Sequence, residues 1–215
     1  MSRCDVVIID YGMGNLLSVR RGLEHCGASV VVTTDPDEIL SATRVVLPGV
    51  GAFADGMAEL RRNGLDVAVR ELAGKGTPLL GICLGMQMLL DESEEFGRTL
   101  GLGLIPGRVV PVPSVGIDGL RQKIPHIGWN GLVLPEGRKC WGNTLLHAVV
   151  PGEAAYFVHS FMASPTSREH SLANCLYGGQ PVTAAIGRGN IVGCQFHPEK
   201  SGEVGLKILR AFCAS

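Results

Sequence analysis

The sequence contains no apolar run that approaches the roughly 20 residues a helix needs to span a bilayer. It also has no excess of either charge, since 19 lysines and arginines stand against 20 aspartates and glutamates. This balance provides no electrostatic footprint for nucleic acid or for an anionic membrane surface. The N-terminus carries an early acidic residue and no hydrophobic stretch that ends in a cleavage site, so no signal peptide is expected.

The sequence also lacks a cysteine pattern that would indicate disulfide bonds. The chain has seven cysteines, an odd number at irregular spacings, and no CxxC motif. This pattern does not fit a disulfide framework. We therefore expect a soluble cytoplasmic protein with reduced thiols. Six of the cysteines are interpreted as ordinary structural residues: Cys4, Cys26, Cys140, Cys175, Cys194 and Cys213.

Short apolar segments alternate with helical patterns through the first 90 or so residues. Strands are predicted at residues 5–10, 29–33, 44–47 and 78–82. Helices are predicted at residues 16–26, 36–41, 54–73 and 84–91. Strands with continuous apolar character are typical of parallel sheets covered on both faces, and their alternation with helices indicates βαβ crossovers.

The second half of the sequence has a different character. It is rich in glycine and proline between residues 97 and 135, with short β-prone pieces at 108–110 and 132–134. Further strands are predicted at 154–161, 171–177, 181–186 and 191–196, the last two joined by a hairpin turn at 187–190. Ser201 is expected to cap a final helix over 203–213.

We therefore predict an α/β fold: a doubly wound, mostly parallel sheet with flanking helices and an added antiparallel β region. A length of 215 residues with 46% hydrophobic content is enough for one substantial core. No repeat, low-complexity tract or linker divides the sequence. A single domain over residues 1–215 is the expected organisation.

A candidate nucleophile lies where an apolar strand runs into a helix. Gly81-Ile82-Cys83-Leu84-Gly85 is a G-x-nucleophile-x-G elbow with sulfur in place of a hydroxyl. The sharp turn strains the backbone and leaves no room for flanking side chains, which explains the two glycines. The helix N-terminus favours the thiolate form, and the backbone N–H of Leu84 would serve as an oxyanion donor. The elbow alone leaves a peptidase, a thioesterase and a redox sensor open.

A candidate base and its orienting carboxylate lie near the C-terminus. In an extended segment, residues two apart project to the same side, so His197 and Glu199 are predicted to share a face. Pro198 between them stiffens the pair. A carboxylate on one imidazole nitrogen fixes the tautomer and leaves the other nitrogen to exchange a proton with Cys83.

These motifs resemble the class I glutamine amidotransferases, which use a Cys-His-Glu triad. The resemblance rests on PLLGICLGMQ (78–87) and QFHPEKS (195–201), supported by DYGMGN (10–15), PGVGAF (48–53), PHIGWN (125–130) and YFVHS (156–160). Within that family the sequence is most similar to glutaminase subunits that feed ammonia to a (β/α)₈ cyclase, which makes imidazole glycerol phosphate in histidine biosynthesis. The motifs span nearly the whole chain.

The resemblance implies roles for further residues. Val50 and Gly51 match an oxyanion strand whose glycines let a backbone N–H turn toward developing negative charge. The positions that match glutamine-binding residues are Gly49, Gln87, His159, Ser160 and Phe161. Those that match positions near the cyclase partner are Met13, Asn15, Trp129, Tyr156 and Lys200. The resemblance implies a heterodimer with that cyclase and no metal or organic cofactor.

Two alternatives remain open, and two others are disfavoured. A related glutaminase could feed a synthase that modifies surface sugars, because Phe161 stands where tyrosine is common and residues 166–177 are untypical. A cysteine peptidase or hydrolase could use the same elbow, although it would not need Gln87 or the PGVG loop. A catalytically silent subunit is disfavoured by the intact triad. A glutaminase for vitamin B6 synthesis is disfavoured by the DYGMGN and PHIGWN motifs.

Overall fold

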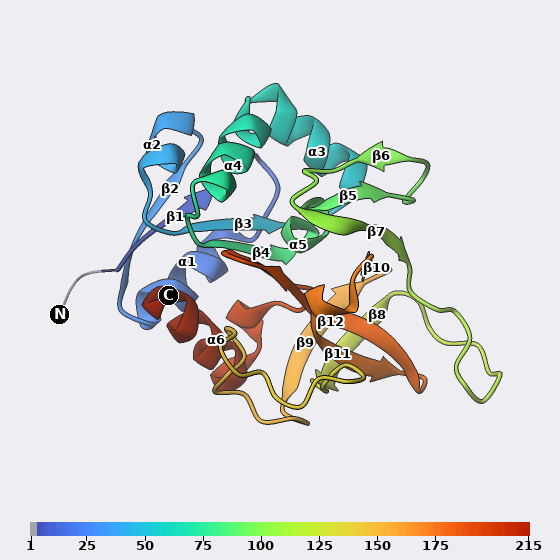
Figure 1. Ribbon diagram of the computed structural model, residues 1–215. Helices are drawn as coiled ribbons and strands as arrows, with labels where there is room; N and C mark the ends of the chain where they lie inside the picture. The colour runs from blue at the N-terminus through green and yellow to red at the C-terminus, as the bar shows by residue number, and fades with distance from the viewer. Residues whose placement is uncertain (1–3) are drawn as a thin grey trace.

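The computed structural model describes residues 4–215 and is built around one large twisted sheet (Figure 1). Its strands are β1 (Cys4–Ile9), β2 (Ala28–Thr33), β3 (Val45–Gly49), β4 (Leu79–Cys83), β11 (Ser171–Tyr177), β12 (Gln180–Arg188) and β13 (Ile191–Cys194). Their order across the sheet is β11-β12-β13-β4-β3-β1-β2. The strands from β13 to β2 run parallel, and β12 and β11 extend one edge in antiparallel fashion.

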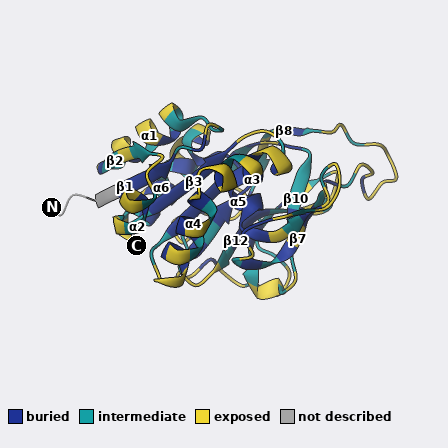
Figure 2. Cartoon of the chain, turned by 90° about the horizontal axis from the view of Figure 1, so that it is seen from above, coloured by how far each residue is buried: buried dark blue, intermediate teal, exposed yellow. Residues whose placement is uncertain are grey.

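Helices cover both faces of this sheet. They are α1 (Leu16–His25), α2 (Pro36–Ser41), α3 (Phe53–Arg62), α4 (Leu65–Gly74), α5 (Leu84–Met88) and α6 (Gly202–Ala214), with 3₁₀ turns at Arg168–His170 and Pro198–Lys200. One apolar cluster joins the sheet to α1 and α6, and a second joins its other face to α2, α3 and α4. Seen from above, the strands are largely buried, whereas the outer faces of the helices are exposed (Figure 2).

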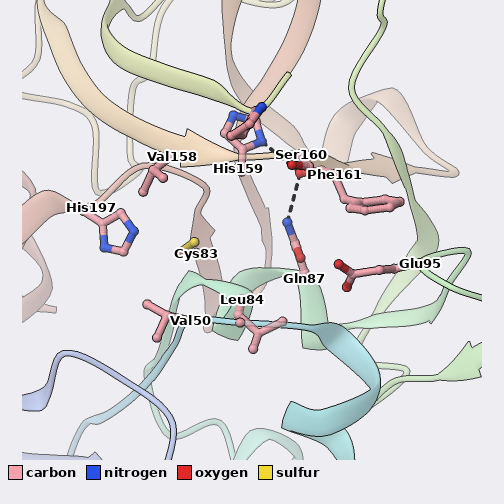
Figure 3. Close-up of a pocket in the computed structure, with 12 residues that line it drawn as sticks. Val50, Cys83, Leu84, Gln87, Glu95, Val158, His159, Ser160, Phe161 and His197 are labelled. Carbon is pink, nitrogen blue, oxygen red and sulfur yellow. Dashed lines mark hydrogen bonds between the residues drawn. The ribbon is translucent and has the colours of Figure 1, made fainter. Parts of the chain in front are cut away.

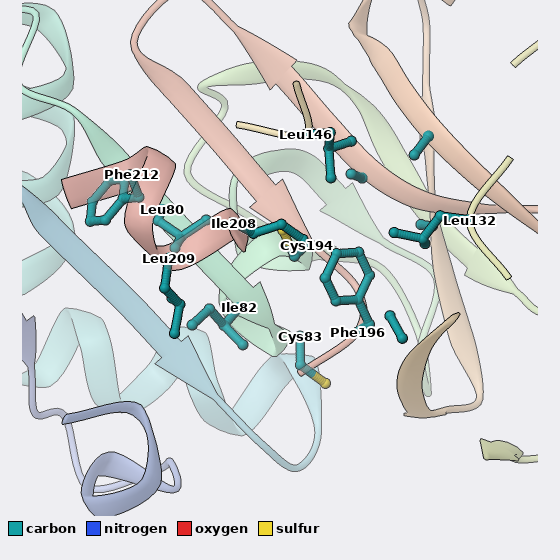
Figure 4. Packing of buried hydrophobic residues seen from close by; sticks show 14 of the residues in the cluster. Leu80, Ile82, Cys83, Leu132, Leu146, Cys194, Phe196, Ile208, Leu209 and Phe212 are labelled. Atoms are coloured by element: carbon teal, nitrogen blue, oxygen red, sulfur yellow. The ribbon is translucent and has the colours of Figure 1, made fainter. Parts of the chain in front are cut away.

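The pleat of β4 explains how one strand serves both clusters. Leu80 and Ile82 project into the cluster with α6, where they lie near Leu209 and Phe212 (Figure 4). Leu79 belongs to the cluster on the opposite face. All five residues of β4 are buried, as expected for a central parallel strand. The strand is thereby held firmly from both sides up to its last residue, Cys83.

Two smaller β structures lie at the carboxyl end of the large sheet. A four-stranded sheet has the order β10-β7-β5-β6. It contains β5 (Leu90–Ser93), β6 (Thr99–Leu100), β7 (Ile105–Pro111) and β10 (Phe161–Pro165). An antiparallel ribbon pairs β8 (His126–Gly131) with β9 (Ala154–His159). The loop 112–125 between β7 and β8 projects from the body of the molecule (Figure 1).

The predicted architecture is confirmed, with differences at particular elements. The helix expected at 84–91 ends at Met88, because Leu90 begins β5 in the second sheet. The strand expected at 154–161 is divided into β9 and β10, which belong to different sheets. The sequence did not predict β8, and residues 132–134 contribute only an isolated bridge between Val133 and Asn174. No helix within residues 4–215 has the length and apolar character that a membrane crossing requires.

Gly85 is the glycine whose replacement the fold tolerates least at the elbow. A Cβ added there would lie 1.8 Å from the carbonyl oxygen of Leu47, an atom of the neighbouring strand β3. We expect Gly85→Ala to lower the free energy of unfolding by about 1–3 kcal/mol or more, because backbone atoms cannot move aside cheaply. Gly74→Ala at the end of α4 is the matched control, since a Cβ there meets nothing within 4 Å. Urea denaturation of both variants tests this, and equal stabilities would contradict it.

Candidate active site

The carboxyl ends of β3, β4 and β13 meet at one edge of the sheet, where open α/β folds bind ligands. A cavity of about 390 Å³ opens there. It is lined by Val50, Gly51, Cys83, Leu84, Gln87, Glu95, Pro125, Val158, His159, Ser160, Phe161 and His197. Residues from the two halves of the chain therefore converge on one space (Figure 3).

Cys83 occupies the strained turn that the sequence predicts. Its backbone has φ 55° and ψ −110°, in the left-handed half of conformational space that side chains rarely adopt. The flanking glycines are required by close packing. A Cβ at Gly81 would lie 2.8 Å from backbone atoms of Gly85 and Met86. The surrounding strands thus hold the thiol in a conformation that an isolated chain would avoid, which is a feature of functional sites.

His197 and Glu199 form a buried pair. Nδ1 of His197 lies 2.8 Å from Oε1 of Glu199, and their side chains are 3% and 1% exposed. Because a carboxylate can only accept, Nδ1 is the protonated nitrogen in the neutral ring. Nε2 makes no hydrogen bond with any described residue, and the imidazole lies beside the Cys83 sulfur (Figure 3). Catalytic hydrogen bonds of this kind commonly tighten only with substrate in place.

The electrostatics of His197 reflect both neighbours. Burial by itself lowers the pKa of the imidazole, because it penalises the charged form. Interaction with the Cys83 sulfur and the hydrogen bond to Glu199 outweigh burial, and the negative charges of both groups add to them. The result is a pKa raised to about 9. His197 therefore carries a proton at neutral pH that it could give to a leaving group.

This raised pKa predicts a dependence of stability on pH. The folded chain binds a proton at His197 more tightly than the unfolded chain, whose histidine has a pKa of 6.5. The associated stability is complete below about pH 6.5 and is lost as the pH rises through 9. Urea denaturation at several pH values measures this slope. In Glu199→Gln the negative partner is absent, so the slope between pH 6.5 and 9 should be shallower. An unchanged slope in that variant would contradict the assigned cause.

The 3₁₀ turn that carries Glu199 is anchored to β9. The backbone N–H of His197 donates to the carbonyl of Tyr156 at 3.0 Å. Ser201 accepts from the N–H of Tyr156 at 3.0 Å and donates to the carbonyl of His197 at 2.7 Å. Ser201 does stand before α6, but its side chain makes no capping hydrogen bond. Ser201 is therefore the N-cap residue of α6, as expected, but its hydroxyl holds the histidine segment against β9 and does not cap the helix.

Most of the expected substrate-binding residues line the cavity. Gln87, one turn beyond Cys83, donates from Nε2 to the carbonyl oxygen of Phe161 at 3.0 Å (Figure 3). Ser160 and Phe161 lie on the same side of the space. Gly49 does not line it. A Cβ at Gly49 would collide with the hydroxyl of Tyr11, so this glycine is required for packing behind the cavity.

His159 lines the cavity, but its ring is already engaged. Nδ1 lies 2.8 Å from the carbonyl oxygen of Phe161, and Nε2 lies 3.0 Å from Nδ1 of His126. Burial lowers the pKa of His159 to about 4, with smaller contributions from the two neighbouring histidines. The ring is therefore neutral and has no nitrogen left for a ligand. Any contact of His159 with a substrate would therefore come from its backbone or the face of its ring, and its substrate-binding role stays a prediction.

The segment expected to form the oxyanion strand lies across the cavity from Phe161. Val50 is 43% exposed, and Gly51 has φ +100°, a conformation that favours glycine. Earlier in the same segment, the carbonyl oxygen of Pro48 accepts a hydrogen bond from the buried hydroxyl of Tyr11 at 2.8 Å. The strand is thus fixed up to Gly49 and becomes exposed at Val50. A rotation of the backbone that turns an N–H toward the cavity is therefore confined to Val50 and Gly51.

Glu95 is a lining residue that sequence reasoning missed. Its Oε2 accepts a hydrogen bond from the N–H of Phe53 at 2.7 Å, at the start of α3. It is the one carboxylate among the residues that line the cavity. It follows β5, whose first two residues were predicted to end a helix, so its position could not be inferred from the sequence. A carboxylate at this point gives the cavity an attraction for a cationic group.

The residues expected near a partner fall into two groups on the surface. Trp129 and Tyr156 face each other across the β8–β9 ribbon with ring centroids 6.0 Å apart, and Trp129 is 61% exposed. Nζ of Lys200 lies 6.0 Å from the centre of the Tyr156 ring. Met13 packs against Gly51, while Asn15 caps α1 through a hydrogen bond from Ser18. The first group adjoins the histidine segment and Met13 adjoins the exposed end of the oxyanion segment.

Comparison with known proteins gives a consistent result across the whole chain. Residues 7–215 match the family "Glutamine amidotransferase class-I". The chain is 54% identical to "Imidazole glycerol phosphate synthase subunit HisH 1" of Legionella pneumophila (strain Lens), over 96% of this chain and 97% of the relative. It is 48% identical to the subunit HisH of Moorella thermoacetica, over 96% of this chain and 93% of the relative.

Solved structures agree in fold. A crystal structure described as a glutamine amidotransferase superposes with a TM-score of 0.71 at 16% identity, covering 97% of this chain and 99% of the other. A chain in the structure of PurLQS from Thermotoga maritima also reaches a TM-score of 0.71 at 20% identity, covering 98% of this chain and 97% of that one. At these identities the likeness concerns the fold alone.

Proposed function

Because this chain belongs to the class-I glutamine amidotransferase family, we propose that it is the glutaminase subunit of an imidazole glycerol phosphate synthase in histidine biosynthesis. It hydrolyses glutamine to glutamate and ammonia and passes the ammonia to a (β/α)₈ cyclase. The observation that carries the chemistry is the placing of Cys83 at a strained elbow beside the buried His197–Glu199 pair, in one cavity. Identity of about half to named subunits of that synthase supports the pathway.

The proposed reaction is acyl transfer through a thioester. The sulfur of Cys83 attacks the carboxamide carbon of glutamine, and the oxyanion is stabilised by the N–H of Leu84 and one from Val50 or Gly51. His197 gives its proton to the leaving nitrogen, which departs as ammonia. Water then attacks the thioester carbon, with His197 as the base, and releases glutamate and the free thiol. Glu199 holds the imidazole in the required orientation and balances its charge.

The cavity suggests how glutamine is oriented. Both N–H groups of the Gln87 amide are used within the chain, so its oxygen remains as an acceptor. Glu95 supplies a carboxylate, one oxygen of which is occupied by the N–H of Phe53. We assign Glu95 to the α-ammonium group of glutamine, the one cationic part of the substrate. Val50, Gly51, Ser160 and Phe161 contribute the remaining contacts from the backbone and side walls.

The cyclase is proposed to dock over the mouth of this cavity, on Trp129, Tyr156 and Lys200 on one side and on Met13 and Asn15 on the other. An exposed tryptophan beside a half-buried tyrosine supports this placement, because aromatic residues are enriched at interfaces. We propose that the pair functions in the cytoplasm as a heterodimer, with this chain as a single domain. No cofactor takes part in the reaction as written.

The pathway assignment is tested by the identity of the partner. The tagged chain is purified from its native host and the proteins that accompany it are identified by mass spectrometry. We expect a (β/α)₈ cyclase, and we expect the chain to restore growth without histidine in a bacterium that lacks its own glutaminase subunit. Recovery of a sugar-modifying synthase, together with failure to restore growth, would overturn the assignment in favour of that alternative.

A further inference from the structure

Gln195 is a fully buried polar side chain at the site with no role in the mechanism above. It follows β13 directly, and its backbone N–H donates to the carbonyl oxygen of Ala184 at 2.8 Å. Its side chain is 0% exposed. It contacts two groups of the site: Oε1 lies 3.0 Å from Nε2 of Gln87, and Nε2 lies 3.8 Å from Sγ of Cys83. A buried amide without hydrogen-bond partners would destabilise the fold, and these two contacts satisfy one oxygen and one nitrogen of Gln195.

The directions of these hydrogen bonds follow from the neighbouring groups. The carbonyl oxygen of Phe161 can only accept, so the atom of Gln87 that faces it must be the nitrogen. The second hydrogen of that nitrogen points to Gln195, which must therefore present its oxygen. The nitrogen of Gln195 is consequently the atom turned to Cys83. The chain of donors ends at the sulfur and can run in no other direction.

The Phe161 carbonyl, which sets these directions, is also held by a pair of histidines. Nδ1 of His159 must donate to the carbonyl oxygen of Phe161, so the neutral ring accepts at Nε2. His126 therefore donates from Nδ1 to His159 and accepts at Nε2, which lies 3.4 Å from Nδ2 of Asn130. Both rings are neutral because burial lowers the pKa of each. Two donors thus converge on the Phe161 carbonyl and hold it in place.

From this geometry we propose that Gln195 is a positioning residue for the nucleophile, which donates a hydrogen bond to the Cys83 sulfur and at the same time turns the oxygen of Gln87 toward glutamine. A donor to sulfur favours the negatively charged form, because charge-assisted hydrogen bonds are the stronger ones. The second function depends on the same side chain accepting from Gln87. The inference rests on the proposed function, because it assigns Gln195 to that reaction.

The reactivity of the Cys83 thiol tests this without any glutamine turnover. Iodoacetamide alkylation of the peptide containing Cys83 is followed by mass spectrometry from pH 5 to pH 10, in the full-length chain. We expect Gln195→Met, which keeps the length but removes both hydrogen bonds, to raise the midpoint of alkylation by about one pH unit. At neutral pH, alkylation should slow by about tenfold. In the complex with the partner, kcat for glutamine should fall and KM should rise, because Gln87 loses its fixed orientation.

Two further variants make the outcome specific. Val192→Ala shortens a side chain near the opposite end of the same strand, and it should leave the midpoint unchanged. Gln87→Met leaves the amide of Gln195 present but without its hydrogen bond to Gln87, so the midpoint should rise by less than in Gln195→Met.

If Gln195→Met does not fold, the shift of the midpoint in Gln87→Met decides the outcome. An unchanged midpoint in the folded Gln195→Met variant, or in Gln87→Met when it alone folds, overturns the proposal. A shifted midpoint in a chain that shows no glutaminase activity would instead preserve the positioning role and reject the proposed function.

Discussion

Cys83→Ala is expected to reduce glutamine-dependent synthesis by about 10⁴-fold or more, while synthesis from added ammonium continues at its normal rate. Loss of a covalent nucleophile removes the step on which the other triad members act, and losses of this size are usual for such residues. In the proposed complex the acceptor reaction takes place on the cyclase, so free ammonia is expected to bypass the defect. The measurement is product formation by the complex with glutamine or with ammonium chloride as the nitrogen source.

The variant must remain folded for this comparison to be meaningful. Cys83 occupies a φ of 55°, and alanine adopts this conformation no more readily than cysteine does. Cys83→Ser is the closest control in shape, and its hydroxyl should be nearly inactive at this position. Equal losses with glutamine and with ammonium would indicate a disrupted complex. Retained glutaminase activity in Cys83→Ala would eliminate Cys83 as the nucleophile.

The second large effect is the expected stimulation of glutaminase activity by the partner. The isolated chain should hydrolyse glutamine slowly, and the cyclase with its own substrate bound should raise kcat by about 10²–10³-fold, the value of one oxyanion donor. Two contacts connect the proposed interface to the site. Met13, on the proposed interface, packs against Gly51 at the exposed end of the oxyanion segment. Tyr156, also on that surface, accepts a hydrogen bond from the backbone of His197.

Gly51→Val tests the oxyanion segment directly. The φ of +100° at this position disfavours any side chain, and valine is among the least tolerant because it is β-branched. We expect the variant to bind the cyclase but to show little stimulation. The comparison needs kcat for the chain alone, with the partner, and with the partner and its substrate. Three values within about twofold, a barrier difference of only about 0.4 kcal/mol, would mean that the enzyme is constitutive.

The sequence predicted the features that depend on local rules. The elbow at Cys83 is confirmed, because the need for small flanking residues is a property of the turn itself. The contact between His197 and Glu199 is present in the structure as well, since residues two apart across a proline are constrained locally. The fold class could be predicted, but the full strand order could not, because βαβ units limit the possible topologies without fixing which strands are neighbours.

The sequence could not predict features that depend on distant pairing. The ribbon of β8 and β9 joins His126 to His159 across 33 positions, and β8 lies in a glycine-rich segment with no strand pattern. The same pairing engages both ring nitrogens of His159, which the motif alone did not reveal. Glu95 was missed because the helix before it ends early, at Met88. Gln195 belonged to a motif already quoted, yet only the structure places its amide between Gln87 and Cys83.

The most direct test of the central claim, that this chain makes ammonia for a bound synthase, is transfer of labelled nitrogen. The complex is supplied with glutamine labelled with ¹⁵N in the side-chain amide, in a buffer containing excess unlabelled ammonium at a pH where little free ammonia is present. We expect the product of the synthase to carry the label almost undiluted, with one glutamate formed for each product molecule. Product nitrogen that matches the isotopic composition of the buffer, or product formed without glutamate, would contradict it.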